Sequence, residues 1–368
     1  MDSITQATLG AAIGELILGK RLGNRAITWG ALFGTLPDLD ALFMPLFDTA
    51  GQLWWHRGPS HSLLVMIFAS WLLAKPLSRL WKRDGISLAR AGWFIFAAWS
   101  THVLIDCFTA YGTSVFWPLP VDRIAFNNLF IIDPLFTAPM LVALVWLAFL
   151  RKKKHQAKRR RLNAWGLGLA SAYAMLSIGL KFAAAEAFER DLATRNVSYD
   201  RRMEAPTPFN IILWRSVVDR GDELWVGYRS VLEFDKQPIK WTIFPKGNDA
   251  LKSYAELREA KSLDWFSNGW WIARPHVKGV WIADMRFGEI RTWGTKEGMV
   301  DNRPVFSWNI NMQARGDKLQ RLPRQELDAK ETLKRLAVRA MGARDTWDAQ
   351  PRLTGITGSF PEFLMVAD

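Results

Sequence analysis

The stretch "RKKKHQAKRRR", residues 151–161, carries eight Lys and Arg in eleven positions. An apolar run flanks it on each side, Leu129–Leu150 and Leu162–Leu180. A helix needs about 20 mostly apolar residues to cross the hydrocarbon core of a bilayer. A basic cluster between two such runs is typical of a cytoplasmic loop between membrane spans. The alternative interpretation of the cluster is a patch that binds nucleic acid or anionic lipid.

The same pattern of apolar runs extends toward the start of the chain. Three further runs of this kind are Ile27–Phe47, Ser62–Leu80 and Ala91–Ala110. The shorter run Ile4–Leu18 contains Glu15 and predicts an embedded half-helix. We therefore expect an α-helical membrane domain of five to six spans or half-spans in residues 1–185. Residues 186–368 have the mixed composition of a water-soluble domain.

The second half shows the pattern of a soluble α+β domain rich in antiparallel sheet. Aromatic and β-branched residues are dense in four stretches that Gly, Pro and Asn-Asp breaks separate. The expected strands are residues 223–234, 239–245, 270–287 and 303–313, and the expected helices are 254–262 and 324–341. Trp270, Trp271, Arg274 and His276 form either part of a core or a surface for glycan or lipid, and a core is the more ordinary interpretation.

The positive charge predicts the orientation of the spans. Residues 1–185 hold 19 Lys and Arg against 9 Asp and Glu, out of a net charge of +13 for the whole chain. The basic clusters are Lys20, Arg21 and Arg25; Lys75, Arg79, Lys82, Arg83 and Arg90; and 151–161. They share one side, which should be cytoplasmic, if each run from 27 to 180 crosses once. Segments 48–61 and 111–128 and the C-terminal domain then face the periplasm of a Gram-negative cell.

Several ionisable residues lie in or beside the apolar runs, where they are costly and often mark functional sites. Asp38 and Asp40 follow Pro37, which should break the helix. On a non-helical turn both carboxylates can converge on one point, although a loop that caps a helix is the alternative. His56 and His61 flank a Gly-Pro turn that folds the imidazoles toward each other, unless they are only interfacial residues of an aromatic belt.

Two further positions come from the later runs. His102 and Asp106 are four residues apart and therefore share one helix face. That spacing suits two ligands of one metal ion, a His ligand with its carboxylate, or a buried hydrogen bond. Asp133 stands beside a proline and is a metal ligand, an acceptor for a ligand or a helix cap. With the orientation above, all these residues and Asp122 fall at the outer face, which favours a mixed nitrogen and oxygen metal site.

Zinc fits such a site best, with one or two ions, and manganese or iron is the alternative. The segments "PDLD" (37–40), "WHRGPSHS" (55–62), "HVLID" (102–106) and "IIDPLF" (131–136) resemble the YdjM-like family of bacterial inner-membrane proteins. The family is described as LexA-regulated, metal-dependent hydrolases, distantly similar to zinc-dependent phospholipases C. The resemblance covers about residues 1–150 and says nothing firm about the C-terminal half. It implies metal ligands at Asp38, Asp40, His56, His61, His102 and Asp106.

The expected function is an inner-membrane hydrolase with a divalent metal at the periplasmic face, acting on a phosphoester of a lipid or lipid-linked substrate. Asp38 or Asp106 would act as general base, and Arg57 would clamp a phosphate. Nucleic acid is not an expected partner, and the sequence makes no prediction of oligomeric state. A non-catalytic scaffold with a structural metal site and a partner-binding domain is the alternative. An ion or proton transporter would need charged groups through both halves of the membrane.

The orientation can be tested with reporter fusions. We expect a reporter fused after residue 185 to be active only outside the cytoplasm, and one fused near residue 155 only inside, because Lys and Arg are retained on the cytoplasmic side. The reverse pattern would place the His and Asp motifs in the cytoplasm.

Overall fold

A computed structural model describes the chain except residues 151–152, 235–236, 294–298, 324–328, 345–346, 348–349, 355–361 and 368. The chain forms two compact units. The helical unit comprises Met1–Pro45, Trp55–Ile178 and Pro208–Asn210. The C-terminal unit comprises Leu46–Trp54, Gly179–Thr207 and Ile211–Asp368. The predicted fold class is confirmed, because an N-terminal helical region is followed by a region of two largely antiparallel sheets.

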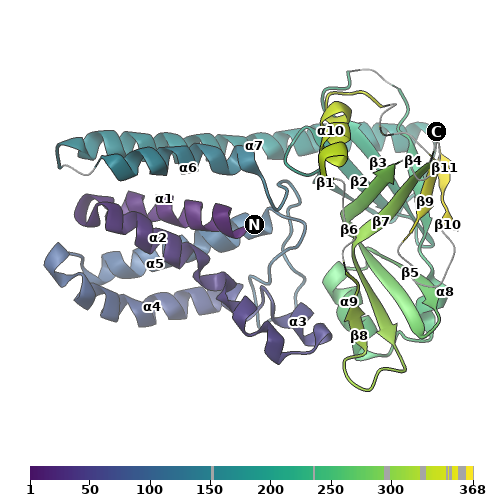
Figure 1. The fold of residues 1–368 in the computed structure, drawn as a ribbon, viewed down its shortest axis with the longest axis horizontal. Helices are drawn as coiled ribbons and strands as arrows, with labels where there is room; N and C mark the ends of the chain where they lie inside the picture. The colour runs from purple at the N-terminus through teal and green to yellow at the C-terminus, as the bar shows by residue number, and fades with distance from the viewer. Residues whose placement is uncertain are drawn as a thin grey trace. The chain divides into compact units, whose positions relative to one another are not determined.

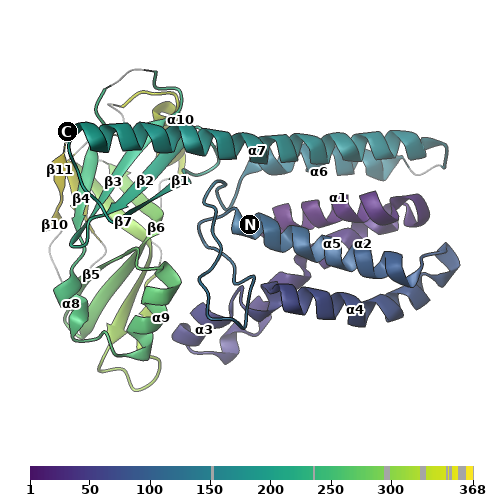
Figure 2. The same cartoon turned by 180° about the vertical axis from the view of Figure 1, so that it is seen from behind.

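The helices of the first unit are arranged as three hairpins (Figures 1 and 2). They are α1 (Ser3–Leu22) with α2 (Asn24–Thr35), α4 (Leu63–Leu80) with α5 (Leu88–Cys107), and α6 (Pro134–Phe149) with α7 (Gln156–Thr194). By length and composition, α4, α5 and α7 could cross a membrane, and α6 is a shorter apolar helix. The short helices η4 (Lys82–Asp84) and η5 (Lys153–His155) lie in the second and third turns.

The three hairpin turns lie at one end of the helical unit, and the described residues of the three basic clusters lie in or beside these turns (Figure 1). Arg25 beside the first turn forms an ion pair with Asp84 in the second, at 3.2 Å. Gln156 at the third turn donates to the carbonyl of Lys20 at the first, at 3.5 Å. The clusters that the sequence assigned to one side of the membrane therefore meet in space.

The apolar run Ile27–Phe47 is not the single helix expected from its length. Helix α2 ends at Thr35, and the 3₁₀ helices η1 (Leu36–Leu42) and η2 (Met44–Leu46) follow. The break at Pro37 was predicted, because proline removes a donor and restricts the residue before it. A helix of 12 residues is about 18 Å long, well short of the ~30 Å hydrocarbon core.

Helix α1 is longer than the expected half-helix, since it spans 20 residues. Its acidic residue Glu15 is buried but fully paired. Arg159 of α7 donates to both Glu15 carboxylate oxygens, at 3.0 and 2.6 Å. Such bidentate pairing offsets the cost of desolvating both charges, so the helix continues through this position.

Helices α1 and α2 touch backbone to backbone through glycines. A Cβ on Gly30 would lie 2.3 Å from the carbonyl oxygen of Gly10, and a Cβ on Gly34 would lie 2.6 Å from the Gly10 Cα. Small residues of this kind permit close approach of membrane helices. The contact fixes the position of α2 against α1 and therefore where the last carbonyl groups of α2 lie.

The C-terminal unit contains a five-stranded sheet of order β1-β2-β3-β4-β11 and a six-stranded sheet of order β10-β9-β7-β6-β5, with β8 beside β7. The strands are β1 (Arg201–Pro206), β2 (Leu213–Asp219), β3 (Glu223–Ser230), β4 (Trp241–Pro245), β5 (Trp271–His276), β6 (Gly279–Trp293), β7 (Met299–Asn311), β8 (Leu319–Arg321), β9 (Gln350–Leu353), β10 (Glu362–Phe363) and β11 (Met365–Ala367). All pairings are antiparallel except β7 with β9. Leu224, Ile272 and Trp281 belong to a core cluster with residues from both sheets.

The predicted strands correspond to β3 through β7, whereas β1, β2 and β8 through β11 were not predicted. Helix α8 (Asn248–Lys252) precedes α9 (Arg258–Ser267), which begins later than expected, and α10 is Ala329–Ala340. The expected start of α10, residues 324–328, lies outside the described residues. Trp270 and Trp271 are buried, which agrees with the interpretation of this stretch as part of a core. Arg274 forms a bidentate ion pair with Glu362.

The close contact between α1 and α2 can be tested by substituting its glycines. We expect Gly30→Ala to lower the stability of the detergent-solubilised protein by about 1–3 kcal/mol, because the new methyl group overlaps the Gly10 backbone. Gly168→Ala, where no atom lies within 4 Å, should be neutral. Thermal unfolding followed by circular dichroism measures both, and equal melting temperatures would contradict the packing.

Candidate metal centre

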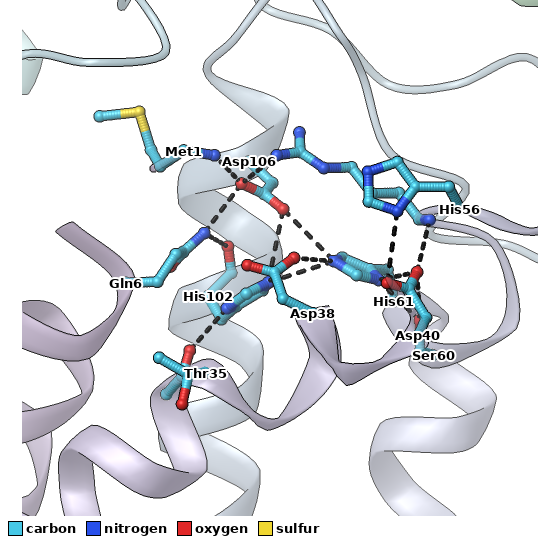
Figure 3. Close-up of polar contacts among 12 residues, drawn as sticks. Met1, Gln6, Thr35, Asp38, Asp40, His56, Ser60, His61, His102 and Asp106 are labelled. Atoms are coloured by element: carbon cyan, nitrogen blue, oxygen red, sulfur yellow. Dashed lines mark hydrogen bonds and ion pairs between the residues drawn. The ribbon is translucent and has the colours of Figure 1, made fainter. Parts of the chain in front are cut away.

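Four side chains converge beside the last two turns of α5 (Leu88–Cys107) (Figure 3). Asp38 comes from η1, His61 ends η3 (Pro59–His61), and His102 and Asp106 lie on α5. One ligand atom of each residue lies within 4.8 Å of the other three. The side chains of His61, His102 and Asp106 are fully buried, and that of Asp38 is 23% exposed.

The end of α2 determines how His102 is held. Pro37 has no N–H, so it cannot donate to the carbonyl of Gly34 in the 3₁₀ pattern that follows. That carbonyl lies 2.6 Å from Nδ1 of His102. Because a carbonyl only accepts, Nδ1 carries the proton, and Nε2 of His102 presents its lone pair to the cluster.

A parallel arrangement sets the tautomer of His61. The Ser60 hydroxyl donates to Oδ2 of Asp40 at 3.2 Å, and it therefore accepts from Nδ1 of His61 at 2.9 Å. Nε2 of His61 is thus also left with a lone pair. In the neutral tautomers that these contacts favour, the two Nε2 atoms, of His61 and His102, lie 3.1 Å apart and each presents a lone pair.

The donor atoms fit a cation. Oδ1 of Asp38 lies 3.5 Å from each Nε2, and Oδ2 of Asp106 lies 3.4 Å from each. Four ligands of a tetrahedral zinc ion at about 2.0–2.1 Å would be about 3.3–3.4 Å apart. Oδ2 of Asp106 is buried and accepts no hydrogen bond from any described residue. A divalent ion would satisfy all four acceptors at once, and the set suits zinc while also admitting manganese or iron.

The other oxygen of Asp106 is fully occupied. Oδ1 accepts from Nε2 of Gln6 at 2.8 Å and from the amino group of Met1, and Nη2 of Arg57 lies 3.3 Å away. These contacts keep the carboxylate ionised in position and turn Oδ2 toward the two histidines. Ligand carboxylates in metal sites are commonly held by such hydrogen bonds.

Asp40 and His56 lie beside the four-residue cluster and are not members of it. Oδ1 of Asp40 is 3.3 Å from Nδ1 of His56, and Oδ2 accepts from the backbone N–H of Arg57 at 2.8 Å. Asp40 therefore closes the turn between His56 and His61 and orients His61 through Ser60. Asp38 and Asp40, expected to converge on one point, contact different faces of the site.

Arg57 is buried, at 4% exposure, and has a positive φ of 55°. Its guanidinium lies over the ring of Tyr111, 4.8 Å from the centroid, and Arg123 lies 5.2 Å from the same ring. Nη2 of Arg123 donates to the carbonyl of His56 at 2.8 Å. Nε and Nη1 of Arg57 have no hydrogen-bond partner within the described part of the chain.

Asp133 lies outside the cluster and is a helix cap. Its Oδ1 accepts from the backbone N–H groups of Leu135 and Phe136 at the start of α6. Its Oδ2 accepts from the hydroxyl of Tyr173 at 3.1 Å. Of the three roles left open by the sequence, capping is the one that these contacts support.

Sequence reasoning overlooked four contributors: Gln6, Gly34, Ser60 and Tyr111. Two of them could have been found from the sequence. Gln6 is a polar residue in an apolar run, and Ser60 lies between Pro59 and His61. Gly34 acts through a backbone carbonyl, which no side-chain pattern can reveal. Tyr111 depends on how the loop after α5 folds back.

All six residues predicted as ligands fall in residues 1–185, and this is the range that matches the family model for the YdjM inner membrane protein. The chain belongs to the YdjM inner membrane protein family. Residues 186–368 extend beyond the part that the family model matches. The resemblance drawn from the four motifs is thereby confirmed, and so is the assignment of the chain to the inner membrane.

The chain is similar to the inner membrane protein YbcI of Escherichia coli (strain K12), to which it is 33% identical over 117 residues. The match covers 32% of this chain and 66% of the relative, so it spans slightly less than two thirds of that protein. No solved structure matches the chain.

The geometry of this YdjM-family chain separates ligands from supporting residues. We expect His61→Ala and His102→Ala to abolish stoichiometric metal in the purified protein, because each removes a buried nitrogen donor that a hydrogen bond orients. Asp40→Asn should weaken metal affinity by about 10- to 100-fold, since Asp40 only orients His61. Metal content by mass spectrometry and zinc titration measure this.

His155→Ala and His276→Ala are the controls and should retain full occupancy. Full occupancy in the His61 and His102 variants would exclude the cluster as the binding site.

Proposed function

We propose that the protein is a metal-dependent hydrolase of the inner membrane, acting at the periplasmic face on a phosphoester in a lipid or lipid-linked substrate. One observation carries the proposal. Four acceptor atoms on Asp38, His61, His102 and Asp106 meet beside Arg57, a buried arginine with two nitrogen atoms that have no hydrogen-bond partner among the described residues. A cation site next to an anion-binding group is the arrangement that phosphoester hydrolysis requires.

His61, His102 and Asp106 would hold the metal as the fixed ligands, because all three are buried and oriented by further hydrogen bonds. A divalent ion bound there supplies Lewis acidity for a water molecule and for the scissile phosphoester. Three protein ligands with a remaining position are typical of catalytic zinc sites.

Asp38 is the better candidate for the general base. Asp106 is fully buried, and its Oδ1 already receives three donors, so it is poorly placed to take a proton from water. Asp38 is the one carboxylate of the cluster that solvent reaches. It would accept the proton of the attacking water and pass it to the leaving group.

Arg57 would bind the phosphate. Its Nε and Nη1 have no hydrogen-bond partner among the described residues, and each can donate to an oxygen of a phosphate. The guanidinium groups of Arg57 and Arg123 both lie within about 5 Å of the centre of the Tyr111 ring, and this contact helps to hold Arg57 in place. Two cations at one ring raise the local positive potential and favour an anionic substrate.

Two observations support the periplasmic placement of the site. The basic turns lie at the end of the helical unit opposite to the cluster, and basic loops are retained in the cytoplasm. Residues 46–54, which connect the motifs of Asp40 and His56, belong to the same compact unit as residues 211–368. The C-terminal unit would therefore share the compartment of the site.

A structural metal site in a non-catalytic membrane scaffold is the second candidate. It is favoured by the number of donors, because four protein ligands can close the coordination sphere of zinc. The two functions differ in what Asp38 does: it is a base near an open position in the enzyme and the fourth ligand in the scaffold.

Substitutions at Asp38 and Arg57 separate the two functions. In an enzyme, Asp38→Asn should retain metal and lose about 10²-fold or more in turnover of a phosphoester, the scale of acid–base assistance. Arg57→Lys should retain metal but weaken substrate binding, because an ammonium cannot reproduce the planar guanidinium with donors at fixed positions. Metal content and rates on phosphomonoester, phosphodiester and phospholipid substrates are the measurements.

A scaffold gives the opposite result. Asp38→Asn would then reduce metal content and thermal stability together, and no phosphoester would be hydrolysed by the wild-type protein. That combination would overturn the hydrolase proposal.

A further inference from the structure

A short segment of the N-terminal half belongs to the C-terminal unit. Residues Leu46–Trp54 interrupt the helical unit, which resumes at Trp55. The segment is bounded by the two halves of the candidate site, because Asp38 and Asp40 precede it on η1 and His56 follows it. It contains most of helix α3 (Thr49–Trp55).

The start of α3 is held by two polar contacts. Arg258 of α9 forms a bidentate ion pair with Asp48, at 2.7 and 3.1 Å. The backbone N–H of Thr49 donates to Oδ2 of Asp317 at 2.7 Å. Asp48 also accepts from the backbone N–H of Gly51 at 2.8 Å, so the same carboxylate caps α3 and binds α9.

The end of α3 is held by an aromatic contact. The ring of Trp54 stacks on Trp265 of α9, with centroids 3.8 Å apart and planes at 11°. Nε1 of Trp54 donates to the hydroxyl of Ser262 at 2.9 Å. Both ends of α3 are therefore fixed, and the fixed residue Trp54 is two positions before His56.

The chain after Trp54 has little freedom to absorb a movement of α3. The N–H of Gly58 donates to the carbonyl of Trp55 at 3.1 Å, and the N–H of His61 donates to Gly58 at 3.1 Å. A displacement of Trp54 therefore reaches His61 through a short hydrogen-bonded turn, and Arg57 lies within the same turn.

We propose that the C-terminal unit positions the candidate metal centre by clamping residues 46–54, with Arg258 and Trp265 as positioning residues. The role deepens the proposed function, on which it rests. The unit contributes no atom to the cluster of Asp38, His61, His102 and Asp106, and acts through the covalent continuity of α3 with the turn at 56–61.

The experiment uses the full-length protein in detergent and measures hydrogen exchange of the backbone amides of residues 55–62. Arg258→Ala combined with Trp265→Ala should raise exchange at Gly58 and His61 by about tenfold or more, because release of α3 permits local opening of the turn. Trp265→Phe retains an aromatic ring and should preserve protection.

Lys261→Ala is the matched control, because Lys261 lies on the same helix and forms a comparably exposed ion pair with Glu256. It should leave the exchange of residues 55–62 unchanged. Unchanged circular dichroism of the double variant shows that the β-sheet unit still folds.

A second arm measures zinc affinity of the same variants, with zinc alone as the probe. The double variant should bind about 10-fold more weakly or worse, as is common when support of a ligand is lost, and the Lys261 and Trp265→Phe variants should bind as the wild type does. Increased exchange confined to residues 46–54, with unchanged zinc affinity, would overturn the proposal.

Failure of the proposed function is distinguishable from failure of this inference. If the wild-type protein binds no zinc and hydrolyses no phosphoester, the proposed function fails, and the exchange measurement still decides whether the clamp reaches residues 55–62. If zinc binds but exchange at Gly58 and His61 is the same in all variants, the clamp alone is excluded.

Discussion

The hydrogen bond from Nδ1 of His102 to the carbonyl of Gly34 is the contact on which the site depends. It exists because α2 ends at Thr35, and the carbonyl groups of a helix's last turn have no donor within the helix. It also requires α2 to lie where it does, which the glycine contacts between α1 and α2 permit. Through this bond, the end of one helix decides which nitrogen of a histidine on another helix can bind a cation.

The electrostatics of the site follow from the cost of burying charge. An isolated carboxylate such as Asp106 could not remain ionised in a dry interior without partners. Gln6, Arg57 and the Met1 amino group stabilise one of its oxygens, and a cation is the natural partner for the other. The same arginine then has donors left over beside the cluster. Charge neutralisation of the ligands and recognition of an anion are therefore linked through one residue.

The sequence predicted the parts of this architecture that depend on local pattern. Apolar runs separated by basic clusters predicted the helical region, and the four-residue spacing placed His102 and Asp106 on one face. The extent of the run from Ile27 was misleading, because apolar composition also suits a short helix followed by 3₁₀ turns packed inside a bundle. Strands β1 and β2 lacked a clear alternation, since β2 is buried along its whole length.

The separation of Asp38 from Asp40 could not be predicted from spacing alone. Two carboxylates on a 3₁₀ turn point in directions set by what surrounds the turn, and here the His pair lies on one side and Ser60 with His56 on the other. The division between ligand and support is therefore a property of tertiary packing. His56 illustrates the same point, because its contact with Asp40 places it beside the cluster and not in it.

The four acceptors of the cluster are anchored to different degrees. His102 and Asp106 lie one turn apart on α5, a helix packed within the bundle, and cannot move independently. Asp38 and His61 are carried by short 3₁₀ helices on either side of the segment 46–54, which belongs to the C-terminal unit. His102 and Asp106 are therefore carried by one helix of the bundle. Asp38 and His61 are carried by short 3₁₀ helices that residues 46–54 connect. Asp38, the acceptor that solvent reaches, lies in the second half, so the candidate general base lies on the part of the site that the proposed clamp of residues 46–54 would influence.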